Sequence, residues 1–442
     1  MLRLIHFSDI HFCSPFCDSP DTDQNIHIRD RVKRDIVEFI QIDGKEVDAI
    51  LITGDIAFAG KESEYLAAHK WLDEIKSALR LGNDRILVVP GNHDIDRNAA
   101  DGYLPKMVRN EIASKQTNEL REKAIQEALI SEQAYDAMFA PMQSYIDFSS
   151  HYKCSISTNR TFWTRSLDLS AQVKVEFRGI TTTLFSNKSD TRGSIVLSNN
   201  QLNFRSLPGV LNVSLMHHPC DWLIDGDEVA DMLDNNVHVQ LFGHKHRSRW
   251  GNTDNVLKVE SISLHPEKYE PGYEPGYNII DLSQTEMIEK KCMIMAKVVV
   301  RKLEFNPQLF VSKKFAGGKE FFSKEFTLDI EEPKVSSVPK EVIGTNSKEK
   351  ATENISVLNR LNTANSSEPP ELESKDIKEA SRIFGQLERS TRDRILLDCG
   401  LIEQDELTES DVKKQQIAFQ RAIEQGKEHL LHDTIMIEGK AL

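Results

Sequence analysis

The feature that most constrains this chain is a pattern that occurs five times, a short apolar run followed by a polar group that can bind metal. The runs end in SDIH (Asp9, His11), GDIA (Asp55), GNHD (Asn92, His93, Asp94), MHHP (His217, His218) and GHKH (His244, His246). Short apolar runs that alternate with helical stretches predict buried strands of a parallel sheet. Because ligand sites in open α/β sheets lie at the carboxyl ends of the strands, we expect these side chains to converge.

The spacing within the motifs fits a metal site. In D-x-H and H-x-H the two outer residues leave the strand on the same side, while the residue between them points elsewhere. Glycines at Gly54, Gly91 and Gly243 lack a Cβ where the backbone has to turn close to the ions. Carboxylate, imidazole and amide ligands suit Mn²⁺, Zn²⁺ or Fe, and two such ions can clamp a phosphate ester. Without metal, so many buried polar groups would cost several kcal/mol.

The remaining pattern predicts an α/β fold with strands and helices in alternation. Helical spacing occurs at 34–41 and 62–79, and the expected strands are 2–8, 47–53, 85–90, 173–186, 210–217, 237–243, 255–264, 277–282 and 297–306. A charged helical stretch at about 105–150 interrupts the strands. It is either a solvated cap or a functional lid, since long insertions in compact domains are often functional.

The C-terminal quarter of the chain differs in composition. Residues 331–372 are rich in Ser, Pro, Asn, Lys and Glu and read as a flexible linker. Helical spacing returns at 373–442, which predicts a small all-α module. A unit of this size often needs a partner, so these helices are expected to bind another protein or the catalytic domain. The sequence thus predicts a catalytic domain at 1–330, a linker and a helical module.

Composition limits the other possibilities. The chain of 442 residues has 55 basic and 69 acidic residues, a net charge of −14. An acidic surface disfavours sequence-independent wrapping of a phosphate backbone, so nucleic acid is a possible partner that the charge does not indicate. No apolar stretch is long enough for a membrane span, and the N-terminus does not resemble a signal peptide. Six scattered cysteines fit reduced thiols. We therefore expect a soluble, cytoplasmic protein without a membrane partner.

Taken together, the five motifs resemble those of the calcineurin-like metallophosphoesterase superfamily over roughly residues 1–285. The details GDIAFAG, VPGNHD, HHP and GHKH are most similar to the bacterial class III cyclic nucleotide phosphodiesterase branch. The resemblance implies a four-layer αββα sandwich and two divalent metal ions per chain, with Mn²⁺ expected and Fe, Zn²⁺ or Mg²⁺ as alternatives. It implies one metal held by Asp9, His11 and His246, a second held by Asn92, His217 and His244, and Asp55 as the bridge.

The resemblance also implies roles around the metals. His93 lies over the phosphate as the catalytic acid or charge stabiliser, and Asp94 fixes its tautomer. Of the adjacent pair, His217 is the expected ligand, and His218 faces the substrate pocket or lies behind the ligands, with the reverse assignment as the alternative. Arg97 is a candidate phosphate contact.

The expected function is phosphodiester hydrolysis by a bridging hydroxide, on a substrate such as a cyclic nucleotide. The alternatives are a nuclease for DNA or RNA, and an effector or regulatory module coupled to a partner through the C-terminal helices.

Overall fold

The computed structural model describes the N-terminal three quarters of the chain almost completely. The described residues are 1–246, 249–253, 255–265, 274–330, 384, 389–402, 414, 418, 421, 422, 427, 431, 432 and 434–436. The chain divides into two compact units, Met1–Ser337 and Val338–Leu442. The expected linker at 331–372 lies outside the described residues.

The first sheet of the N-terminal unit contains seven strands among the described residues, in the order β12-β11-β10-β1-β2-β3, with β13 also paired to β11. Their bounds are β1 Leu2–Phe7, β2 Ala49–Thr53, β3 Ile86–Val89, β10 Gly276–Ile288, β11 Lys291–Phe305, β12 Gln308–Ser312 and β13 Phe322–Asp329. Strands β1, β2 and β3 run parallel, and β10 is antiparallel to β1. Every residue of β1, β2 and β3 is buried, which explains why these strands read as continuous apolar runs.

The second sheet contains six strands among the described residues, in the order β4-β5-β6-β7-β9-β8. Their bounds are β4 Phe162–Asp168, β5 Lys174–Ile180, β6 Val210–Met216, β7 Val239–Phe242, β8 Arg249–Thr253 and β9 Val256–Glu260. Strands β5, β6, β7 and β9 run parallel. The two sheets pack face to face, with β2 and β3 against β5 and β6. The indole N–H of Trp163 in β4 donates to the carbonyl of Val88 in β3 at 2.7 Å, which ties the sheets together.

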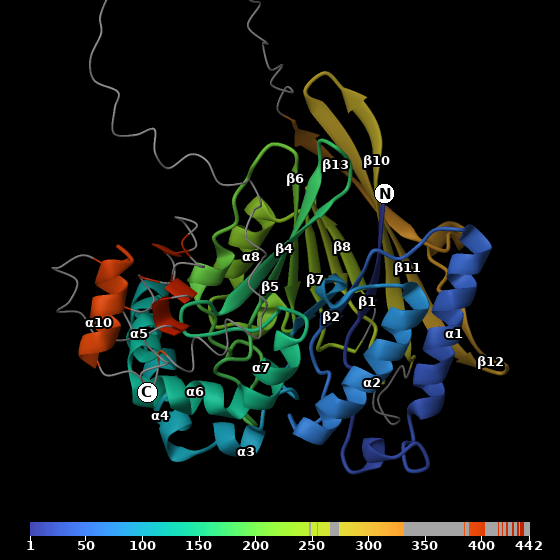
Figure 1. Ribbon diagram of the computed structural model, residues 1–442. Helices are drawn as coiled ribbons and strands as arrows, with labels where there is room; N and C mark the ends of the chain where they lie inside the picture. The colour runs from blue at the N-terminus through green and yellow to red at the C-terminus, as the bar shows by residue number, and fades with distance from the viewer. Residues whose placement is uncertain are drawn as a thin grey trace, which may run out of the picture. The chain divides into compact units, whose positions relative to one another are not determined.

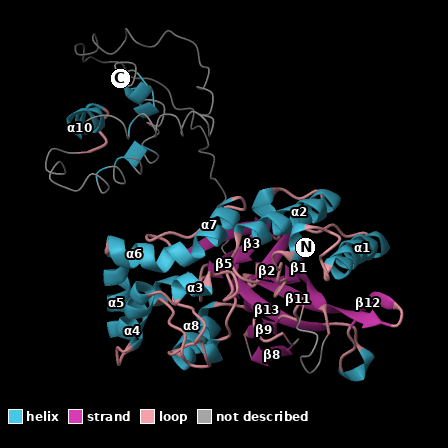
Figure 2. Ribbon diagram, turned by 90° about the horizontal axis from the view of Figure 1, so that it is seen from below, coloured by secondary structure: helices cyan, strands magenta, loops and turns pink. Residues whose placement is uncertain are grey.

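Helices cover the outer faces of both sheets. Helices α1 (Ile26–Asp43) and α2 (Glu62–Leu79) lie along the first sheet (Figure 1), where Trp71 of α2 packs on Phe7 with ring centroids 5.3 Å apart. Helix α8 (Gly226–Asn236) lies on the second sheet and buries Val229 and Leu233 in a cluster with Met216. Figure 2 shows α1 and α2 on one side of the strands and α8 on the other. The expected four-layer αββα sandwich is confirmed.

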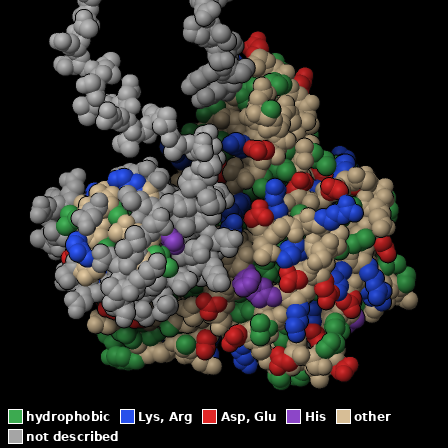
Figure 3. Space-filling view, viewed as in Figure 1, with side chains coloured by type: hydrophobic (Ala, Val, Ile, Leu, Met, Phe, Trp, Pro, Cys, Tyr) green, Lys and Arg blue, Asp and Glu red, His purple; other side chains and the backbone are tan. Residues whose placement is uncertain are grey.

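The helical insertion is present and begins slightly earlier than expected. It consists of α3 (Arg97–Ala100), α4 (Tyr103–Ala113), α5 (Asn118–Ile130), α6 (Glu132–Phe139) and α7 (Gln143–Ser150). Between α2 and α7 lies a groove of about 590 Å³ lined by His69, His151 and Tyr152. Figure 3 shows histidine side chains gathered on this face between the two helices. Short 3₁₀ turns connect other elements, at Phe16–Asp18, Asn83–Arg85, Ala140–Met142, Asn199–Leu202, Cys220–Trp222 and Ala316–Gly318.

Several element boundaries differ from the sequence expectation. The run at 173–186 is strand only as far as Ile180, and residues 181–187 form a buried turn. Apolar and threonine-rich composition here reflects burial at the strand end, which periodicity does not separate from extension. The helix expected at 34–41 extends over Ile26–Asp43, and the strands expected at 277–282 and 297–306 are longer.

The C-terminal unit contains α10 (Arg389–Asp398) among its described residues. Phe384, Ile395 and Leu396 belong to a buried apolar cluster that also includes Leu401 and Ile435. This agrees with the helical character expected of the segment. Across the described parts of the chain, no helix is both long and apolar enough to cross a membrane.

Candidate metal centre

The polar groups of the five motifs meet at the carboxyl ends of strands from both sheets. Asp9 and His11 follow β1, Asp55 follows β2, and Asn92 follows β3, while the two histidine motifs follow β6 and β7. Among the described residues, two groups have ligand atoms within 4.8 Å of one another. These groups are Asp9, His11, Asp55 and His246, and His217, His218 and His244. The predicted convergence is therefore what the structure shows.

The backbone at these positions is unusual. Asp9, His11, Asp55, His244 and His246 all have a positive φ, between 51° and 70°. A non-glycine residue rarely adopts this left-handed conformation, and each such residue costs on the order of 1–3 kcal/mol. Such strain persists only where the surrounding structure imposes it, and it is common at functional sites. Five such residues at one place indicate a site whose side-chain directions are set by the backbone.

The first group surrounds a buried carboxylate. Asp9 is fully buried, and neither of its oxygens accepts a hydrogen bond in the structure. His246 Nε2 lies 3.2 Å from Asp9 Oδ1, and His11 Nε2 lies 3.9 Å from Asp55 Oδ2. A buried carboxylate without hydrogen-bond donors is costly unless a cation neutralises it.

The second group is built around an amide oxygen. His217 Nε2 lies 3.1 Å and His244 Nδ1 3.0 Å from Asn92 Oδ1. His217 Nε2 also lies 3.3 Å from Asp55 Oδ2, so this carboxylate faces both groups. The other nitrogen of His217 lies 2.8 Å from the carbonyl oxygen of Thr53. A histidine that donates one N–H to a carbonyl presents its other nitrogen as a ligand, which is the usual arrangement in metal sites.

His218 lies closer to the ligand cluster than the sequence suggested. Its ring is fully buried, 4.5 Å from the ring of His244, and its Nδ1 lies 2.9 Å from Thr182 Oγ1. Its Nε2 is buried without a hydrogen-bond partner. Thr182, in the turn after β5, is a site residue that sequence reasoning missed. Its position at the carboxyl end of a parallel strand is the signal that could have identified it.

His93 lies beside the first group, with its ring centroid 4.8 Å from that of His11. Its Nδ1 lies 2.8 Å from the carbonyl oxygen of Phe58 and 3.2 Å from Arg97 Nη2. The shorter contact favours an Nδ1–H that donates to Phe58, which leaves Nε2 for a substrate. The backbone N–H of His93 donates to Asp55 Oδ1 at 2.7 Å.

Asp94 does not make the contact expected of it. Its buried carboxylate accepts from the backbone N–H groups of Gly91 and Ala57 at 2.8 Å each, and from the hydroxyl of Tyr65 at 3.0 Å. The expectation that Asp94 fixes the His93 tautomer is therefore wrong in this structure, where the Phe58 carbonyl holds the ring. Asp94 instead joins the loops after β2 and β3, because its side chain points back into the protein.

The pKa values describe how the site balances its charges. Burial lowers the pKa of His11 to about 4 and that of His244 to about 3, so both rings are neutral near pH 7. Neutral imidazole is the form that binds metal. Burial opposes the charge on His217 as well, but Asp55, Asp9 and the Thr53 carbonyl together outweigh burial and raise the pKa of His217 to about 9. A proton on His217 thus satisfies Asp55 in the way that a metal cation would.

A divalent cation fits this donor set. The carboxylate of Asp9 lacks donors, and the nitrogens of His217 and His244 face the oxygen of Asn92. The close approach of the backbone at Gly91 to the Asp55 carboxylate supports this arrangement of donors. A Cβ on Gly91 would lie 2.1 Å from Asp55 Oδ1, so only glycine allows this loop to pass the carboxylate. Mixed oxygen and nitrogen donors suit Mn²⁺, Fe or Zn²⁺.

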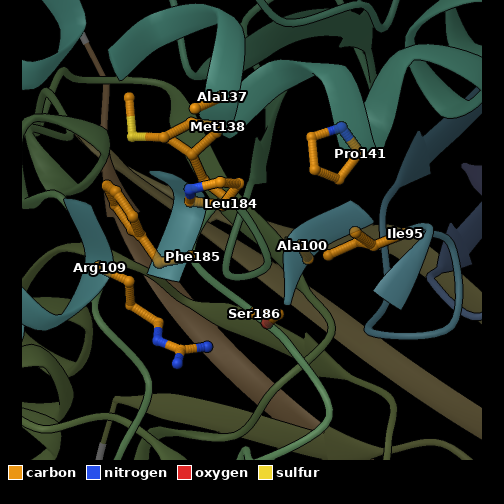
Figure 4. A pocket seen from close by; sticks show the side chains of 10 residues that line it. Ile95, Ala100, Arg109, Ala137, Met138, Pro141, Leu184, Phe185 and Ser186 are labelled. Carbon is orange, nitrogen blue, oxygen red and sulfur yellow. The ribbon is translucent and has the colours of Figure 1, made fainter. Parts of the chain in front are cut away.

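The helical insertion packs against loops that border the site. Figure 4 shows Met138 of α6 beside Leu184 and Phe185 in the turn after β5, with Arg109 of α4 in the same pocket. On the other side, the backbone N–H of Asp96 donates to the carbonyl of Pro141 at 2.9 Å. Helix α6 of the insertion thus packs on the turn that carries Thr182, and Pro141 of the insertion binds the residue that precedes Arg97.

Comparison with known proteins finds a family and a curated relative to which this chain is similar. Residues 2–248 match the family described as calcineurin-like phosphoesterase. The uncharacterized metallophosphoesterase-like protein YydB of Bacillus subtilis (strain 168) is 24% identical over 277 residues, which are 60% of this chain and 52% of that protein. This chain therefore spans about half the length of the curated relative that it matches.

The solved structures that the chain matches have low sequence identity and low TM-scores. GAP50, the anchor in the inner membrane complex of Plasmodium, is 11% identical, with 75% of this chain and 90% of that chain covered and a TM-score of 0.37. Wild-type Vps29 of Entamoeba histolytica, complexed with Zn²⁺, is 9% identical, with 74% and 99% covered and a TM-score of 0.28. The family match covers more than half of the 442 residues and includes all five motifs. The chain therefore belongs to the calcineurin-like phosphoesterase family.

Proposed function

We propose that this protein is a phosphodiesterase that uses two divalent cations, with Mn²⁺ as the expected metal. Asp9, His11 and His246 would hold one cation, Asn92, His217 and His244 the other, and Asp55 would contact both. The observation that carries the proposal is the buried Asp9 carboxylate, which has no hydrogen-bond partner among the described residues and faces the His246 ring in a strained, histidine-rich site. When bound, such cations polarise a phosphoester oxygen and make water nucleophilic near neutral pH.

The protein groups around the metals have separate roles in this proposal. His93 would protonate the leaving oxygen through Nε2, because Phe58 occupies its other nitrogen. Arg97, 3.2 Å from the same ring, would contact the substrate. Thr53 and Thr182 would orient His217 and His218, and a fixed ring orientation lowers the cost of binding metal.

For His218 the geometry supports two uses of the buried Nε2. It faces the ligand cluster, so it can bind the second metal or a substrate oxygen. We propose the substrate contact, because Asn92, His217 and His244 already supply three donors.

The proposed substrate is a phosphodiester such as a cyclic nucleotide, in line with the class III resemblance of the motifs. A nucleic-acid strand is the second substrate class to test. The proposed location is the cytoplasm, and the C-terminal helices are proposed to bind a protein partner.

Hydrolysis of bis-p-nitrophenyl phosphate by the full chain, with and without Mn²⁺, tests the proposal. We expect Mn²⁺-dependent release of nitrophenolate, lost on chelation. Asp9→Asn should remove activity and Mn²⁺ binding together, while Asp84→Asn, at a carboxylate whose side chain is 54% exposed, should keep both. Turnover by Asp9→Asn at the wild-type rate would contradict the proposal.

A further inference from the structure

A pocket of about 430 Å³ adjoins the candidate metal centre on the side of His93. Three segments distant in sequence line it. They are Ala59–Glu62 before α2, Ile95–Asn98 before and in α3, and the insertion residues Ala140, Pro141 and Ser144, joined by Lys188 from the turn after β5. Pockets of this volume are large enough for a small-molecule ligand.

The pocket lies beside the ring of His93, on the side of Nδ1. Arg97 lines it and lies 3.2 Å from this nitrogen. Ala59 lines it one residue after Phe58, whose carbonyl oxygen contacts the same nitrogen. A substrate that meets His93 at Nε2 would therefore have to extend past the ring to enter this pocket, which a longer substrate can do.

The cations of the pocket are free of ion pairs. Lys61 and Lys188 are exposed, and among the residues that the structure describes no carboxylate lies within 4.0 Å of either lysine or of Arg97. The chain carries a net charge of −14, so carboxylates are plentiful. Three cations without an acidic partner thus line one pocket of an acidic protein, where an anionic ligand can reach all of them.

The acids in the lining do not cancel this charge. Asp96 Oδ1 accepts from the backbone N–H groups of Asn98 and Ala99 at 2.9 and 3.1 Å, so its charge stabilises the start of α3. Glu62 is the other acid in the lining, at the start of α2. Lys188 Nζ contacts the neutral amide oxygen of Asn98. The lining therefore has three cations and two acids, and both acids lie at the starts of helices.

We propose that Lys61, Arg97 and Lys188 bind a second phosphate of the substrate, so that the preferred substrate is a dinucleotide or a longer strand. This inference rests on the proposed phosphodiesterase activity and, of its two substrate classes, favours the nucleic-acid strand over the cyclic mononucleotide. Lysine and arginine together are the residues that bind phosphate groups. A cyclic mononucleotide has one phosphate, which the metal centre uses, and leaves nothing for the three cations. The larger groove between α2 and α7 shares Glu62 and Ser144 with this pocket, so a longer strand has room to continue.

The experiment compares linear adenosine nucleotides on the Mn²⁺-loaded full chain. ApA has one phosphate, pApA adds a terminal phosphate, and ApApA adds an internal one. We expect kcat/KM for pApA, ApApA or both to exceed that for ApA by at least about tenfold. The ratio of kcat/KM for pApA to that for ApA reports binding of a terminal phosphate, and the ratio for ApApA to ApA reports binding of an internal phosphate.

Variants connect the preference to the pocket. The double variant Lys61→Gln, Lys188→Gln should lower the ratio of kcat/KM for pApA or ApApA to that for ApA about tenfold. The control is Lys123→Gln on α5, whose side chain is 74% exposed, and it should keep this ratio. Equal kcat/KM for all three substrates, or a preference that survives the double variant, would overturn the proposal. Activity on bis-p-nitrophenyl phosphate is measured in parallel. Its absence refutes the phosphodiesterase itself, and its presence without a preference refutes only the second phosphate site.

Discussion

His217 Nδ1 lies 2.8 Å from the carbonyl oxygen of Thr53, which joins the end of β6 in one sheet to the end of β2 in the other. The same histidine ring turns Nε2 toward Asp55 and Asn92, from the loops after β2 and β3. The site is therefore assembled only when the two sheets pack together. Anything that changes the spacing of the loops should change metal binding and stability together.

Gly91 is the first place to test this coupling. A Cβ at this position would lie 2.1 Å from Asp55 Oδ1 and 2.3 Å from the Asp55 backbone nitrogen. Gly91→Ala should lower the free energy of unfolding by about 1–3 kcal/mol, as overpacking does, and should weaken Mn²⁺ binding. Denaturant unfolding and metal titration measure the two effects. Gly251→Ala, where no atom lies within 4 Å of the new Cβ, is the control, and equal behaviour of the two variants would refute the argument.

His93 should act on the leaving group and not on the metals. His93→Ala should keep bound Mn²⁺ and lose about 10²–10⁴-fold in kcat on a diester with a poor leaving group, because the loss is that of a general acid. On bis-p-nitrophenyl phosphate the loss should be smaller, since nitrophenolate leaves without a proton. An equal loss on both substrates would assign His93 a different role.

Stability should depend on pH through His69 in the groove between α2 and α7. Burial, with a smaller effect of His151, lowers the pKa of His69 to about 4 in the folded protein, against about 6.5 in an unfolded chain. As the pH falls below about 6.5 the unfolded state takes up the proton first, so stability falls between about pH 6.5 and pH 4.

The matched variant is His69→Phe, which keeps a ring beside Phe148 and Tyr152. Its unfolding free energy, measured in denaturant at several pH values, should fall less steeply in this window than that of the wild type. The loss of the contact between His69 Nδ1 and the Tyr152 hydroxyl should lower stability at all pH values alike. An unchanged slope would exclude His69 as the source.

The sequence located the candidate metal ligands because their signal is local. Asp9, Asp55 and His244 each follow a buried strand directly, and strand ends in an α/β sheet share one edge. Lys61 and Lys188 had no such signal, because no local sequence pattern distinguishes them from other surface lysines. Only the folded chain brings them to one pocket. The role expected of Asp94 failed for a related reason, because adjacency to His93 in sequence does not fix the direction of its side chain.

The helical insertion shows the same limit. Composition predicted helices at about 105–150 but left open whether they form a cap or a lid. The structure shows Ala140, Pro141 and Ser144 in the wall of the pocket beside His93, a contact that depends on the tertiary fold.

Removal of the C-terminal unit tests the expected division of the chain. A protein that ends at Ser337 retains the first compact unit and every predicted metal ligand. We expect it to fold cooperatively, to bind Mn²⁺ as the full chain does, and to hydrolyse bis-p-nitrophenyl phosphate at a comparable rate. Loss of cooperative unfolding or of metal would mean that the C-terminal unit is part of the catalytic structure.

The most direct test is the metal content of the full chain after Mn²⁺ loading and removal of free ions, measured by elemental analysis beside activity. We expect about two ions per chain in the wild type, and fewer than one in Asp55→Asn, since this carboxylate faces both ligand groups. Activity on bis-p-nitrophenyl phosphate should fall in parallel with the metal. A wild-type protein that holds no metal, or that keeps full activity in chelator, would contradict the account.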